Sequence, residues 1–151
     1  MVQLVKYEAA RYALQEARSV DEVKDVKDKA EALRLYARQA HDKDMEIWTA
    51  EIKLRAVRRI GELSAALPKI TGENLPNVQA SEHSGKRNVL AGAGISAASA
   101  HNYERIAAIP ESDFEAHIAE QRDAREPATI SGILKPHVAN NSGNNEWYTP
   151  E

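Results

Sequence analysis

The chain has 151 residues, of which 42% are hydrophobic, 5% aromatic and 28% charged, with a formal net charge of −3 and no cysteine. The absence of cysteine excludes disulfide frameworks, thiolate metal sites and thiol catalysis, and no apolar run approaches the roughly 20 residues that a membrane-spanning helix needs. Lys6, Glu8 and Arg11 interrupt the N-terminal residues, which therefore lack the apolar core of a signal peptide. We expect a cytoplasmic protein with no membrane partner.

The first predicted helix covers about Leu4 to Ala17, where apolar residues recur at helical spacing. Ser19 follows, and Glu22 lies three residues later, which is the pattern of a capping box. In such a box the Ser19 hydroxyl accepts from the Glu22 N–H, and the Glu22 side chain reaches back to the Ser19 N–H. A second helix is therefore predicted to begin here.

The stretch from Val20 to Leu67 contains no proline and a single glycine, which predicts a long helix or a helical hairpin that forms a coiled coil. Its apolar seam changes phase near His41–Asp44, either at a stutter in a continuous helix or at a tight turn. The continuous helix is favoured because this segment has no Gly, Pro or Asn. We expect a homo-oligomer, most simply a dimer, whose contacts are Val23, Val26, Leu33, Trp48, Ile52, Ile60 and Leu63.

Composition divides the chain into four parts. Residues 1–67 form the long helical region, and the Pro- and Gly-containing residues 68–85 are a linker. Residues 86–136 are predicted to form a small domain that resembles a helix–turn–helix, in which Thr129 caps a last short helix. Residues 137–151 form a polar tail that ends on aromatic residues. The predicted fold class is all-α.

The segment NVLAGAGISAASAHNY has the spacing of a helix–turn–helix, with Gly94 at the turn. The inward positions are then Val89, Ala93, Ile95, Ala100 and Tyr103. Polar side chains on the outward face can bond base edges or phosphates. The candidate DNA contacts are Lys86, Arg87, Ser96, Ser99, His101, Asn102 and Arg105. The alternative is an ordinary helical hairpin with a polar outer face.

Other sites are not indicated by the sequence. The five histidines are isolated, and none has the spacing of three or four that a helical metal pair needs. The Gly-rich LAGAGISAAS lacks the lysine and the preceding strand of a phosphate-binding loop, so no nucleotide cofactor is expected. Residues 110–151 hold eight acidic and three basic residues. A dedicated nucleic-acid domain is usually basic, so this balance counts against strong autonomous DNA binding.

Two stretches resemble regions of phage and prophage proteins. The residues KYEAARYALQEARSVDEVKDVKDKAEALRLYARQAHDKDMEIWTAEIKLRAVRRIGEL resemble a helical N-terminal region, and GISAASAHNYERIAAIPESDFEAHIAE resembles the small DNA-binding-like segment that follows it. Near the end, Asn145 to Pro150 match the Asn-Glu-Trp-Tyr-Thr-Pro signature that opens the catalytic domain of phage-type DNA N6-adenine methyltransferases. The catalytic Asp-Pro-Pro-Tyr/Trp motif and the Gly-rich loop for S-adenosylmethionine are absent. The resemblance therefore implies the N-terminal part of such an enzyme, without catalytic activity.

Two functions follow as hypotheses. The first is a non-catalytic, phage-derived DNA-binding and self-association module that is accessory to a DNA adenine methyltransferase and binds double-stranded DNA. The alternative is a protein-interaction module, such as a phage regulatory or anti-defence factor, that binds a host or phage protein and no DNA. If Lys86, Arg87 and Arg105 do not share one exposed face with His101 and Asn102, the alternative is favoured.

Overall fold

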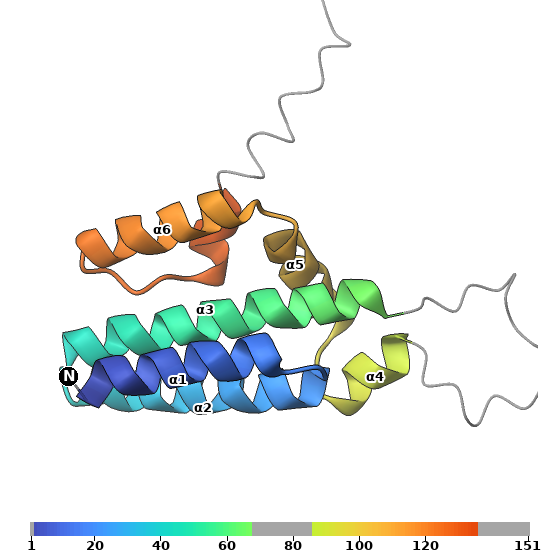
Figure 1. Ribbon diagram of the computed structural model, residues 1–151, viewed down its shortest axis with the longest axis horizontal. Helices are drawn as coiled ribbons and strands as arrows, with labels where there is room; N and C mark the ends of the chain where they lie inside the picture. The colour runs from blue at the N-terminus through green and yellow to red at the C-terminus, as the bar shows by residue number, and fades with distance from the viewer. Residues whose placement is uncertain (1, 68–85, 136–151) are drawn as a thin grey trace, which may run out of the picture.

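The computed structural model describes residues 2–67 and 86–135, and all regular structure in these two ranges is helical (Figure 1). The all-α prediction is therefore confirmed for this part of the chain. The bounds are α1 Val2–Glu16, α2 Val20–Gln39, α3 Lys43–Ala66, α4 Lys86–Gly92, α5 Ala97–Ala107 and α6 Glu111–Asp123, followed by a short helix at residues 130–135. The predicted linker, 68–85, and the tail, 137–151, lie outside the described residues.

The start of α2 follows the predicted capping pattern. Ser19 is the N-cap, and its hydroxyl accepts from the Glu22 N–H at 3.4 Å. The Glu22 carboxylate accepts from the N–H of Arg18, also at 3.4 Å, one residue earlier than the Ser19 N–H that the sequence predicts. The first bond satisfies an N–H group in the first turn of α2 that has no partner within the helix, and the second satisfies the N–H of the residue before the cap.

The continuous helix predicted through residues 41–44 is wrong, because the chain turns there. Helix α2 ends at Gln39, and His41 adopts a left-handed backbone conformation with φ of 55°. Asp42 then caps α3 by accepting from the Met45 N–H at 3.1 Å. A short polar cap and one strained residue therefore replace the glycine that such a turn usually uses. The phase change of the apolar seam marks an antiparallel α2–α3 hairpin.

Helix α3 is the central element of the fold. Helices α1 and α2 lie along one side of it, and α5 and α6 pack against the other side (Figure 1). One hydrophobic core runs through both described ranges, so residues 86–135 share their core with residues 2–67. The largest fully buried apolar side chains in it are Leu54, Ile60, Ile106, Phe114, Ile118 and Ile133.

Gly61 allows the backbones of α3 and α5 to meet. A Cβ atom at this position would overlap the carbonyl group of Tyr103 and lie 2.9 Å from the Glu104 nitrogen. Only glycine fits where two helix backbones approach this closely, since any side chain would have to occupy the space of main-chain atoms.

Ion pairs fasten α6 to α3. The Arg55 guanidinium donates from both terminal nitrogens to the two oxygens of the Glu115 carboxylate, and the distance from Nη2 to Oε2 is 2.9 Å. Glu51 is 1% exposed, and Arg122 donates to both of its oxygens, at 2.9 and 2.6 Å. Bidentate pairs of this kind fix orientation as well as distance. They set the direction in which α6 runs along α3.

Candidate interaction surfaces

The first surface is the predicted helix–turn–helix segment, α4 to α5. Gly94 has a φ of 75° at the turn, which the absence of a Cβ atom permits. Ser96 is the N-cap of α5, and its hydroxyl accepts from the Ser99 N–H at 3.2 Å. The predicted inward positions Ala93, Ile95, Ala100 and Tyr103 are buried, and Val89 is half-buried.

The predicted DNA contacts are not gathered on one face. Ser96 and His101 are exposed, whereas Ser99, Asn102 and Arg105 are half-buried. Lys86 forms an ion pair with Glu104, and only 14% of its side chain is exposed. The side chain of Arg87 lies outside the described residues.

His101 and Asn102 open onto different hollows. Lys86, Ser96 and His101 line a cavity of about 340 Å³ between α4 and α5. Asn102 lines a second one of about 420 Å³ with Arg34 and Lys53. The two side chains therefore have different neighbours, and Lys86 lines the hollow of His101 and not that of Asn102.

The second surface is an apolar groove between α1, α2 and α3, with a volume of about 260 Å³. Four of the seven predicted oligomerisation residues, Val26, Leu33, Trp48 and Ile52, line it. The edge of the Trp48 ring packs against Tyr7, with the ring centroids 5.5 Å apart.

The other three predicted oligomerisation residues have different surroundings. Val23 of α2 and Ile60 of α3 are fully buried within a single chain, in the core that these two helices share with α5. Leu63 is half-buried against the same core. An apolar stripe shows that a helix face will be covered, but the covering helix belongs to the same chain here.

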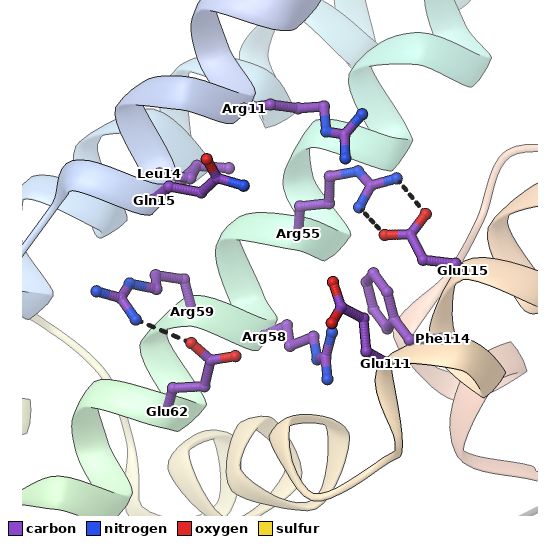
Figure 2. A pocket seen from close by; sticks show the side chains of 10 residues that line it. All are labelled: Arg11, Leu14, Gln15, Arg55, Arg58, Arg59, Glu62, Glu111, Phe114 and Glu115. Carbon is purple, nitrogen blue, oxygen red and sulfur yellow. Dashed lines mark hydrogen bonds and ion pairs between the residues drawn. The ribbon is translucent and has the colours of Figure 1, made fainter.

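The third surface, which the sequence reasoning missed, is a cavity of about 220 Å³ between α1, α3 and α6 that we call the arginine cavity (Figure 2). Arg55, Arg58 and Arg59 of α3 and Arg11 of α1 line it. Arg58 and Arg59 lie three and four residues after Arg55 and so share a helix face with it. That spacing was readable in RAVRR, but the elements opposite it were not.

Carboxylates and an aromatic ring complete the arginine cavity. Its acidic lining residues are Glu62, Glu111 and Glu115. The Arg55 guanidinium lowers the pKa of the Glu115 carboxyl by hydrogen bonding to it. The Arg58 guanidinium stacks over the Phe114 ring with its central carbon 4.7 Å from the ring centroid. Figure 2 shows Arg58, Phe114 and Glu111 between two ion pairs, Arg55–Glu115 on one side and Arg59–Glu62 on the other.

Comparison with known proteins identifies no relative: no family model matches the chain, and searches of curated proteins and of solved structures find no match. In residues 2–67 and 86–135, no helix combines the length and the hydropathy that crossing a membrane requires. The same two ranges hold no group of three or more His, Asp or Glu side chains placed to bind a metal ion. The three surfaces above are therefore the basis for a function.

Proposed function

We propose that this chain is a non-catalytic interaction module that self-associates through the apolar groove. The observation that carries the proposal is the groove itself, in which the half-buried Trp48 and the exposed Leu33 lie beside other aliphatic side chains. Tryptophan is among the residues that most often carry the binding energy of a protein interface, and apolar pockets are common binding sites. Leu33, which is 47% exposed, and Tyr36, one helical turn later and 64% exposed, extend this apolar surface along α2.

The occupant of the groove is a second copy of the chain, with its α2 helix antiparallel to the first. The charges of α2 favour this arrangement. The exposed excess of negative charge in its first half is Asp21 and Glu22, because Asp25 and Asp28 pair with Lys29 and Lys24 of the same helix, whereas the exposed charge of its last turn is Arg38. An antiparallel pair places the acidic half of one helix beside the basic end of the other, which steers association and fixes orientation. The two α2 helices would then form a short coiled coil.

The test is a pair of leucine variants on the same helix. Leu33 lines the groove, whereas Leu35 does not, and the two are equally exposed at 47% and 48%. Leu33→Glu should weaken the dimer by at least about tenfold, since burying a leucine is worth about 1.5–3 kcal/mol. Leu35→Glu should leave it unchanged. Sedimentation velocity over a range of concentrations measures both.

Two results would exclude self-association through this groove. One is wild-type protein that stays monomeric at every concentration. The other is equal weakening by the two substitutions, which would mean that the added charge acts through general repulsion.

A second candidate function is DNA contact by the α4–α5 segment. It is favoured by the burial of the predicted inward positions and by the exposure of Ser96 and His101 at the outer face of α5. In this proposal the paired copies would double the phosphate contacts of the module and gain avidity. Residues 145–150 resemble the start of a methyltransferase catalytic domain. On that basis, the module would present DNA to an adenine methyltransferase in the cytoplasm of a phage-infected or lysogenic cell.

A gel-shift titration across salt concentrations tests the DNA proposal. Arg105→Gln should reduce binding, and Arg125→Gln, an exposed arginine beyond α6, is its matched control. The ion pair of Lys86 with Glu104 predicts that Lys86→Gln has a smaller effect than Arg105→Gln. A folded dimer that shifts no duplex at low salt would leave the protein-interaction function alone.

A further inference from the structure

The arginine cavity holds positive charge that its own carboxylates do not match. Four guanidinium groups line it against three carboxylates. Two of the arginines form ion pairs with carboxylates of the cavity, Arg55 with Glu115 and Arg59 with Glu62, each at 2.9 Å. Glu111 is the remaining carboxylate, and it is exposed at the first turn of α6.

Among the described residues, Arg58 and Arg11 are the two arginines of this cavity that pair with none of its three carboxylates. Arg58 donates from Nη2 to the main-chain oxygen of Ile109 at 3.0 Å. Among the described residues, its buried Nε has no hydrogen-bond partner. Arg11 reaches Glu8 at 3.6 Å, outside the cavity, and Figure 2 shows its guanidinium directed toward Arg55 at the cavity mouth.

The packing around Arg58 holds its guanidinium in place. The Phe114 ring lies against one face of the group, and the bond to the Ile109 oxygen fixes one edge. A guanidinium that is already oriented loses little side-chain freedom when it binds an anion. Removing an arginine from water without a matching anion costs free energy, which an oxyanion would offset.

We propose that the arginine cavity binds a phosphate group through Arg58 and Arg11, with Gln15 as a neutral donor at the rim. The planar fork of a guanidinium matches the spacing of phosphate oxygens. The cavity volume of about 220 Å³ exceeds that of a lone phosphate ion and leaves room for part of the molecule that carries it. The ligand is therefore inorganic phosphate or the terminal phosphate of a small organic molecule.

The test uses inorganic phosphate and adenosine monophosphate as probes, against sodium chloride at matched ionic strength. Each probe should raise the thermal midpoint of the wild-type protein to a plateau and broaden its own ³¹P resonance. Arg11→Gln should weaken phosphate binding about tenfold, the usual cost of one charged hydrogen bond. Arg11 is suited to this because its side chain is 36% exposed and its loss should not unfold the chain.

Arg18→Gln, an exposed arginine that does not line the cavity, is the matched control and should bind like wild type. Stronger binding of adenosine monophosphate than of inorganic phosphate identifies the organic phosphate as the ligand class, and equal binding identifies the free ion. Binding of neither probe above the chloride control overturns the proposal. So does equal weakening by the Arg11 and Arg18 substitutions.

Discussion

Replacing Gly61 with alanine tests the contact between the α3 and α5 backbones. In an ordinary helix this substitution stabilises by about 1 kcal/mol, because alanine loses less chain entropy than glycine. Here the new Cβ would overlap the carbonyl group of Tyr103 and lie 2.9 Å from the Glu104 nitrogen. These are main-chain atoms that cannot rotate away, so the whole of α5 must move.

The size of the effect is the difference between two terms. Overpacking a well-packed interior costs about 1–3 kcal/mol, and a clash with rigid backbone belongs at the upper end. Subtracting the helix-propensity gain of about 1 kcal/mol leaves a net loss of about 2 kcal/mol in the free energy of unfolding. With the usual urea dependence for a protein of this size, the unfolding midpoint should fall by about 1 M.

Gly92 at the end of α4 is the matched control, because a Cβ there meets no atom within 4 Å. Gly92→Ala should be neutral or stabilising by up to about 1 kcal/mol. Urea unfolding followed by circular dichroism at 222 nm measures both variants. A Gly61→Ala protein as stable as wild type would refute the close approach of α3 and α5.

Two further predictions concern the core and the dependence of stability on pH. Phe114 is 1% exposed beneath Arg58, so Phe114→Ala should lower the free energy of unfolding by about 3–5 kcal/mol. Phe114→Leu should lower it clearly less. Urea unfolding measures both variants, and equal losses of stability would contradict a packed ring. Hydrogen bonding by Arg34, together with Lys53, lowers the pKa of Glu31 from 4.5 to about 2. The resulting stabilisation, about 1 kcal/mol after solvent screening, is present above pH 4.5 and is lost as the pH falls toward 2. Glu31→Gln should therefore be less stable than wild type at pH 6 and lose less stability on acidification; parallel stability curves would contradict this.

Local signals in the sequence were the ones that predicted structure correctly. Ser19, Ser96 and Thr129 cap helices as their spacing indicates, and Gly94 provides the turn between α4 and α5. Each of these features depends on bonds between residues a few positions apart. Such bonds form with little reference to the rest of the chain, so the pattern alone is sufficient to predict them.

The turn between α2 and α3 shows where local signals fail. His41 has a positive φ, which few non-glycine residues adopt, and although histidine is more frequent there than most residues, that preference is too weak to predict a turn. The hairpin exists because α2 and α3 bury their apolar faces on each other, a gain that exceeds the strain at one residue. A sequence pattern indicates which helix faces will be buried but does not determine which element covers them. Val23 and Ile60 were therefore expected at an interface between chains.

The arginine cavity depends on contacts between distant parts of the chain. Arg55 and Glu115 are 60 residues apart, and Arg58 bonds to Ile109 across 51 residues. The helical face of RAVRR is visible in the sequence. What lies opposite it is decided by how α6 returns along α3, which no local spacing records.

The contacts of α3 differ in their separation along the sequence, and this difference affects folding kinetics. The α2–α3 hairpin closes through the short turn at residues 40–42, whereas α5 and α6 meet α3 across 40 residues or more. Nearby contacts cost less chain entropy to close, so we expect the hairpin to form first. Removing the Asp42 cap should then slow folding, while shortening Phe114 should mainly speed unfolding, and chevron plots of the two variants would separate these effects. The turn at His41 and Asp42 would thus decide how quickly the chain commits to its native topology.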